Sequence, residues 1–312
     1  MMSVTGPKDI EQIGICQGHE HLFISKGVSY EINPAIYMDE MDKTVEEIRR
    51  FQKAGGQTLV DAQPGGCNRM PEELREASLK TGATIVASTG FHKMMFYPEV
   101  HWIHTFNEKE LYQVFISELT EGMYINCDNA PPQEQISAQA GMVKTAYDIG
   151  ELSGTYPQKF RAAAHAAMEA SVPMVIHIEQ GTNPVKLLDF LLSEAIRGER
   201  LIFSHMDRSI EPEDYYTSVL DKGVTLGFDT IGRFRYHSDE DEIQLIKRLF
   251  DLGYERIICS LDTTRERMKA YSPEAIGLDY MLTSFIPQLA KAGVTKQQIE
   301  KILSKNCINL FS

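Results

Sequence analysis

Eight short runs of apolar and β-branched residues recur at a steady interval along the chain, and this alternation is the strongest constraint on the fold. The runs are IGICQ (13–17), TLVDA (58–62), TIVAST (84–89), MVKTA (142–146), MVIHIE (174–179), LIFSHM (201–206), VTLGFD (224–229) and IICSLD (257–262). Each is apolar on both faces, as the buried strands of parallel sheets are. Charged amphipathic segments of helical length lie between them, for example KTVEEIRRFQKAG, PEELREASLKTG, PQKFRAAAHAAMEAS, NPVKLLDFLLSEAIRG and DEDEIQLIKRLFDLG.

Several of these segments begin with Pro and end with Gly, which are typical start and stop signals of helices. Eight strands, each followed by a helix, in 312 residues predict a single-domain (β/α)8 TIM barrel over 1–312. An open doubly wound sheet is the alternative, but no G-x-G-x-x-G follows the first run. Two long segments, 91–106 and 122–139, are predicted to cover one face as lids. The tail from about Thr295 to Ser312 is predicted to be a helix packed against the barrel.

Composition limits the compartment and the class of partner. The net charge of −13 argues against nucleic acid or an anionic membrane as the main partner, because both require a basic surface. The five cysteines include no C-x-x-C pair, which predicts reduced thiols in a cytoplasmic protein. The N-terminus MMSVTGPKDIEQ has no basic region followed by an apolar one, and no apolar run reaches the length of a membrane span.

Unusual polar residues lie late in several of the predicted strands. In GICQGHEHLFIS (14–25), His19 and His21 are two residues apart and are expected to project from the same face, with Glu20 pointing away. The others are Lys144, His177, His205 and Asp262. A single buried histidine is often only a core residue and a strand-end aspartate is often a helix cap, but a buried lysine is costly unless it is paired or neutralised.

In a barrel, ligands bind where the strands end, at their carboxyl edge. We therefore expect these six side chains to converge on one mouth of the barrel. Alternation along the strands places Val175 with His177, Phe203 with His205, and Ser260 with Asp262 on the inward face.

The sequence resembles the phosphotriesterase-like branch of the amidohydrolase superfamily over nearly its full length. The motifs that carry the resemblance are GHEHL, VKTA, VIHIEQGTNP, FSHMD and SLDTTRE, in this order and on successive predicted strands.

The resemblance implies a centre of two divalent metal ions. His19, His21 and Asp262 would hold the more buried ion, and His177 and His205 the more exposed one. Lys144 would be carboxylated and would bridge the two, which converts a costly buried cation into a bound anion. Zinc is the metal that these ligands favour, with cobalt or manganese as alternatives. A hydroxide between the metals would attack an ester or lactone, with Asp262 as general base and then acid.

Two positions depart from the members of the family that hydrolyse organophosphates. Thr230 and Arg208 stand where those members carry a histidine and an acidic residue that relay protons, which favours a lactonase. The loops after the last two strands are basic, where barrel enzymes often bind phosphate. This cluster comprises Arg233, Arg235, Arg265, Arg267, Lys269 and Tyr271. It resembles the branch that hydrolyses phosphorylated sugar lactones, although any one of these charges could simply be solvated.

Other functions remain open at this point. An acyl-homoserine lactone lactonase would need an apolar channel, which Met94, Met95, Phe96 and Trp102 could line. An organophosphate triesterase would use the same metals, and a barrel that only binds a ligand is a further alternative. The strand-end residues Asp61, Asp148, Glu179 and Asp229 are predicted to orient ligands or cap helices. We expect a small-molecule lactone or ester as partner, neither nucleic acid nor membrane, and leave open a homodimer.

Overall fold

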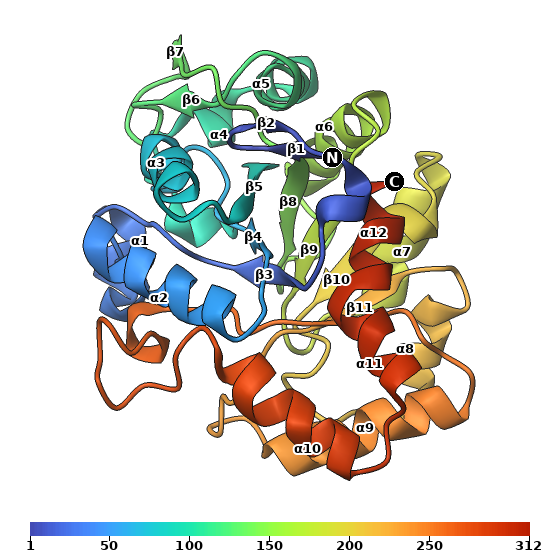
Figure 1. The fold of residues 1–312 in the computed structure, drawn as a ribbon. Coiled ribbons are helices and arrows are strands. Elements are labelled where there is room, and N and C mark those ends of the chain that lie inside the picture. Colours follow the sequence, from blue (N-terminus) through green and yellow to red (C-terminus); the bar gives the residue numbers. More distant parts are fainter.

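Eight parallel strands form the centre of the molecule (Figure 1). The computed structural model describes residues 1–312. In sheet order the strands are β12 (Ile257–Cys259), β11 (Thr225–Phe228), β10 (Leu201–Ser204), β9 (Met174–Ile178), β8 (Met142–Tyr147), β5 (Thr84–Gly90), β4 (Thr58–Asp61) and β3 (Cys16–Glu20). Sequential strands are neighbours throughout, so the predicted (β/α)8 barrel is confirmed and the open doubly wound sheet is wrong.

Helices follow each barrel strand and form the outer layer (Figure 1). They are α1 (Val28–Ile32), α2 (Met41–Lys53), α3 (Pro71–Thr81), α4 (Trp102–Thr105), α5 (Glu108–Thr120), α6 (Tyr156–Glu169), α7 (Pro184–Ser193), α8 (Glu213–Leu220), α9 (Asp239–Asp251), α10 (Ile286–Lys291), α11 (Lys296–Glu300) and α12 (Asn306–Phe311). The predicted stop signal is confirmed at α3, where Gly82 adopts the left-handed conformation with φ 74°. None of the helices combines the length and the apolar character that spanning a bilayer requires.

The core has two parts, one on each side of the strands. The larger part lies between strands and helices. The smaller part fills the barrel and includes Val60, Val175 and Ile258 from the strands. Cys307 and Leu310 of α12 join this inner cluster, which closes the barrel at the end opposite the strand carboxyl ends. Both chain termini lie near this end (Figure 1), and the predicted C-terminal helix is present as α11, a π-helical turn and α12.

Two strands, β10 and β12, end more than one residue earlier than the sequence predicts. β10 ends at Ser204, because the next residue, His205, adopts a positive φ of 64°. β12 ends at Cys259, shortly before Asp262, which adopts a positive φ of 47°. The left-handed backbone at His205 breaks the alternation of the strand. Ile202, not Phe203, therefore belongs to the cluster inside the barrel, and the predicted inward position of Phe203 is wrong.

Side chains rather than a regular ladder close the seam between β3 and β12. The Glu20 carboxylate accepts hydrogen bonds from the backbone N–H groups of Leu261 (2.8 Å) and Thr263 (3.1 Å). The Asp262 N–H donates to the His19 carbonyl at 3.1 Å. Glu20 therefore points away from the histidine side chains, as predicted, and fixes the segment that carries Asp262 against the strand that carries His19.

The segment 122–139 is attached to the outside of the barrel and lines no part of the cavity described below. It forms a small antiparallel hairpin of β6 (Tyr124–Ile125) and β7 (Glu134–Gln135). Arg69 and Glu118 form a buried ion pair beneath it, with one N–O distance of 3.2 Å. The Tyr124 carbonyl accepts from Arg69 and its N–H donates to Glu118. The expectation that 122–139 is a lid is therefore wrong.

This ion pair predicts a large loss of stability when one partner is removed. Glu118→Ala leaves the Arg69 charge buried without its counterion, which typically costs about 3–5 kcal/mol. Glu108→Ala, in the same helix, removes only the more exposed pair with Arg161 and should cost less than about 1 kcal/mol. Denaturant unfolding of both variants tests the prediction, and equal losses would contradict it.

Candidate metal centre

A cavity of about 240 Å³ opens at the carboxyl ends of the barrel strands. Its wall contains all six residues that the sequence predicts as metal ligands, namely His19, His21, Lys144, His177, His205 and Asp262. His19, Lys144 and His177 belong to β3, β8 and β9, and His21, His205 and Asp262 follow the ends of β3, β10 and β12. The structure thus brings together side chains that are up to 243 positions apart in the sequence, from position 19 to position 262.

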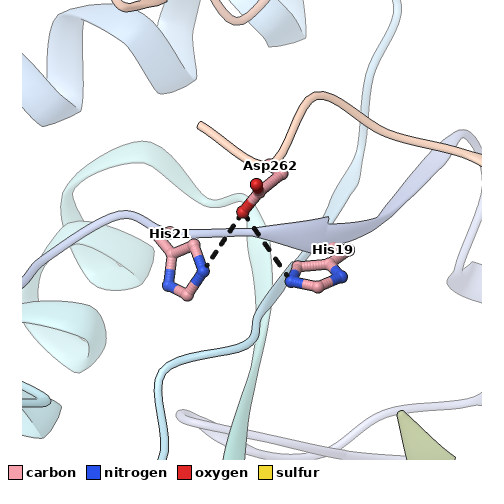
Figure 2. Close-up of side chains that lie close together, drawn as sticks. All are labelled: His19, His21 and Asp262. Carbon is pink, nitrogen blue, oxygen red and sulfur yellow. Dashed lines mark ion pairs between the residues drawn. The ribbon is translucent and has the colours of Figure 1, made fainter. Parts of the chain in front are cut away.

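His19, His21 and Asp262 form one compact group (Figure 2). The Oδ1 atom of Asp262 lies 3.4 Å from His21 Nε2 and 3.8 Å from His19 Nε2. A bulge in the pairing of β3 with β4, between Gln17 and Glu20, accompanies the inward placement of His19. Two imidazole nitrogens and a carboxylate oxygen in one buried place are a donor set that suits zinc and related divalent ions.

Asp229, which follows β11, connects this group to the other histidines. Its carboxylate lies 2.9 Å from Nδ1 of His19, is hydrogen-bonded to Nδ1 of His205, and accepts from the His205 backbone N–H at 3.1 Å. Because both rings use Nδ1 for this contact, their Nε2 lone pairs face away from Asp229 and can serve as metal donors. Burial alone would raise the pKa of Asp229, but the His205 and His19 rings hold it well below its usual range. Asp229 therefore orients ligands, as predicted.

The four imidazoles face one another closely enough to share a site. The His177 and His205 ring centres are 4.4 Å apart, and those of His19 and His205 are 5.0 Å apart. Burial lowers the pKa of His177 to about 3 and also lowers the pKa values of His19 and His205. These three rings are therefore neutral near pH 7, the state in which imidazole binds metal ions.

Lys144 is fully buried in the middle of the group. Its Nζ lies 3.1 Å from His19 Nε2, and burial lowers the pKa of Lys144 to about 8. Gly90 ends β5 beside it, and a Cβ at that position would meet the Lys144 carbonyl at 2.0 Å. An amine with this lowered pKa is partly uncharged near neutral pH, which is the form that reacts with carbon dioxide. The residues present therefore fit a pair of divalent ions bridged by a carboxylated lysine.

Several polar residues of the cavity wall lie outside the predicted ligand set, among them Glu179, which the sequence predicts to orient a ligand or cap a helix. Glu179 Oε2 lies 3.0 Å from His177 Nε2 and 2.6 Å from Lys93 Nζ. Arg208 Nη1 lies 3.6 Å from the other Glu179 oxygen. His92 and Lys93 immediately follow β5, so the strand-end rule could have singled them out within the segment 91–106, of which Phe96 also lines the cavity.

The six residues of the predicted basic cluster are placed differently from one another. Arg233 and Arg235 line the cavity, and Arg233 Nη2 lies 2.9 Å from Asp262 Oδ2. The other four are Arg265, Arg267, Lys269 and Tyr271, none of which lines it. Arg267 is buried and donates hydrogen bonds to backbone carbonyls of the loop that follows β11. Arg265 lies near Glu40, and Tyr271 contacts Thr44.

A comparison with family models decides the relationship. The model of the phosphotriesterase family matches residues 1–311. The chain belongs to the phosphotriesterase family. The predicted resemblance is thereby confirmed, and so is the prediction of a phosphotriesterase-like hydrolase.

Individual proteins are similar to this chain over nearly its full length. A phospho-furanose lactonase of Mycoplasmopsis synoviae is 27% identical, over 97% of this chain and 89% of its own length. The crystal structure of an amidohydrolase from Mycoplasma synoviae matches with a TM-score of 0.92 at 27% identity, covering 99% of this chain and 91% of that one. The phosphotriesterase homology protein from Escherichia coli, complexed with phosphate in its active site, matches with a TM-score of 0.86 at 25% identity, over 96% and 99% of the two chains.

The donor set predicts that the barrel centre holds about two divalent metal ions in protein produced with added zinc or manganese and bicarbonate. His21→Ala should lower this number because it removes an imidazole from the compact group. His165→Ala replaces a histidine on the outer helix α6, paired only with Glu194, and should not change it. Elemental analysis of the three purified proteins measures the content. An equal content in all three would show that the centre is placed wrongly.

Proposed function

We propose that this enzyme hydrolyses a phosphorylated sugar lactone at a centre of two divalent ions. His19, His21 and Asp262 would hold one ion, and His177 and His205 the other, with carboxylated Lys144 between them. Zinc suits these ligands best, with cobalt or manganese as alternatives. We also propose that the enzyme acts in the cytoplasm, because all five of its cysteines are free thiols.

The observation that carries the substrate class is the charge of the cavity wall. Besides Lys144, four basic side chains, Lys93, Arg208, Arg233 and Arg235, line it together with only two carboxylates, those of Glu179 and Asp262. This excess contrasts with the net charge of −13 of the whole chain. A cavity of one sign in a surface of the other attracts a ligand with the opposite charge, so the wall suits a substrate that carries an anionic group.

The guanidinium groups at the rim differ in how firmly they are already paired. Arg233 is bonded to Asp262, and Arg208 lies near Glu179. Arg235 has no carboxylate partner. It lies over the Tyr236 ring at 4.8 Å and donates to the Tyr236 hydroxyl. Arg235 is therefore the group best placed to offer its planar fork to a phosphate.

The names of related proteins support this class. The Mycoplasmopsis synoviae relative is called a phospho-furanose lactonase, and the Escherichia coli structure holds phosphate in its active site. The acyl-lactone alternative has weaker support, because only four of the 20 residues that line the cavity are hydrophobic. Of the predicted channel residues, Phe96 lines the cavity, whereas the Trp102 ring is buried and donates to the Cys127 carbonyl.

The reaction follows from the roles of these residues. Two divalent ions in this place would lower the pKa of a water molecule and polarise the lactone carbonyl. Asp262, with one oxygen toward His19 and His21 and the other held by Arg233, would take the proton of the attacking water. It would then return the proton to the ring oxygen as the lactone opens. Arg235 would hold the phosphate and so orient the carbonyl over the centre.

Replacement of Asp262 tests the proton transfer. Asp262→Asn should lower kcat by about 10²–10⁴-fold, because the amide cannot accept the proton. Asp251→Asn, on the exposed side of α9, should leave kcat unchanged. The metal content of each variant is measured alongside the kinetics. Near-normal turnover with retained metal would show that another group is the base.

Replacement of Arg235 tests the substrate class. One lost charge-assisted hydrogen bond is worth about 1.5–3 kcal/mol, so Arg235→Ala should lower kcat/KM for a phosphorylated sugar lactone roughly ten- to hundredfold. Hydrolysis of the dephosphorylated lactone should not change. Arg265→Ala, outside the cavity, is the matched control. If the unmodified enzyme hydrolyses plain or acyl-chain lactones with a kcat/KM equal to that for the phosphorylated lactone, the result would favour the acyl-lactone alternative.

A further inference from the structure

A second group of side chains that could bind a metal ion lies between the carboxyl ends of β10 and β11 and the start of α9. It consists of Asp207 in the turn after β10, His237 in the loop after β11, and Glu242 in the first turns of α9. One ligand atom from each lies within 4.8 Å of the others. None of the three lines the barrel cavity, so the group is separate from the centre described above.

The carboxylates of this group lack partners although they are fully buried. Asp207 and Glu242 are both 0% exposed. One oxygen of Asp207 accepts from the Thr230 N–H and hydroxyl, but its other oxygen and both oxygens of Glu242 receive no hydrogen bond from an N–H or hydroxyl group, and the two carboxyl groups contact each other. Unpaired buried carboxylates are strongly unfavourable, so this arrangement calls for a positive species between them.

The rest of the protein supplies no such charge. Burial, and then the neighbouring Asp207 carboxylate, raise the pKa of Glu242 well above its usual range. The other charged groups that affect Glu242 most are the carboxylates of Asp239 and Asp229. The cluster is therefore a local excess of negative charge beneath the loop between β11 and α9.

His237 distinguishes a bound cation from a proton shared by the two carboxylates. Its Nδ1 lies 3.1 Å from the Ser238 carbonyl, so Nδ1 carries the hydrogen and Nε2 keeps its lone pair. The Thr230 hydroxyl lies 3.3 Å from Nε2, but it has one hydrogen, which it donates to Asp207. A shared proton would leave this lone pair to solvent at the half-buried edge of the ring, whereas a cation would satisfy it together with the carboxylates. An N–H to carbonyl bond on the other nitrogen is also the usual support of a metal-binding histidine.

We propose that Asp207, Glu242 and His237 bind a divalent cation at a second site, outside the barrel cavity. Two carboxylates and one imidazole suit zinc or manganese, with water in the remaining positions. The His237 ring is half-buried, so an ion can enter from the surface. The site does not depend on the proposed reaction.

A cation in this position would clamp three elements together. It would join β10, through Asp207, to the start of α9, through Glu242, and to the end of the loop 230–238, through His237. Arg233 and Arg235 lie in this loop and line the cavity. The ion would therefore fix the segment that carries the basic side chains of the rim.

Native mass spectrometry tests the site. Chelator-treated protein is reloaded with Mn²⁺, desalted and weighed. The unmodified protein and the control variant His165→Ala should hold one ion per chain more than His237→Ala and Glu242→Gln. Because the test compares the number of bound ions between variants, its result does not depend on how many ions the barrel centre holds. His237→Ala removes a half-buried loop side chain, which keeps the test usable if Glu242→Gln does not fold.

Crystals grown with Mn²⁺ give a second measurement. An anomalous difference peak between Asp207, Glu242 and His237 is the expected result. Equal ion counts in all four proteins would overturn the proposal. A map with no peak at these residues, and with the Asp207 and Glu242 oxygens in direct contact, would overturn it in favour of a shared proton.

Discussion

The contact of one buried carboxylate, Asp229, with two imidazoles is the constraint on which the centre depends. Asp229 engages Nδ1 of both His19 and His205, which lie on opposite sides of it along the barrel. A histidine ring can present only one nitrogen to a ligand when the other is bonded, so this contact fixes which nitrogen faces the cavity. In His19 the same Nδ1 also lies 2.8 Å from Ser204 Oγ, so the hydroxyl and the carboxylate hold the same side of the ring.

The backbone is adapted to the same purpose. His205 and Asp262 both adopt the left-handed conformation, which costs a non-glycine residue roughly 1–3 kcal/mol. Each is held there by bonds to a neighbouring element. The His205 N–H donates to Asp229 and the Asp262 N–H donates to the His19 carbonyl, while Glu20 ties down the residues on either side of Asp262. Ligand geometry and barrel closure therefore rest on the same few hydrogen bonds.

The sequence predicts the barrel and the residues that meet in its mouth, because strand period and the strand-end rule are local signals. It does not predict how His205 turns inward, since its left-handed backbone depends on Asp229, 24 positions away. Arg267 shows the same limit. In the sequence, Arg267 is one of several charged residues in a basic loop. In the fold, it is buried and donates hydrogen bonds to the carbonyls of Ile231 and Gly232, and so supports the loop that carries Arg233. Whether an arginine faces a ligand or a carbonyl is decided by contacts between distant segments.

The separation of charge within the site has a functional consequence. The imidazoles and Asp262 are buried and form the floor of the cavity, whereas the more exposed basic side chains of Lys93 and Arg235 belong to loops and form its rim. Binding energy gained at the rim, away from the reacting carbonyl, can be used to hold the substrate in the orientation that reacts. A charged group on the substrate then improves the rate as well as the affinity, because the orientation it imposes persists in the transition state. The same floor with an uncharged rim would bind a neutral lactone with much less control over the position of its carbonyl. In the proposed reaction, the basic rim would therefore determine specificity and the floor would determine the chemistry.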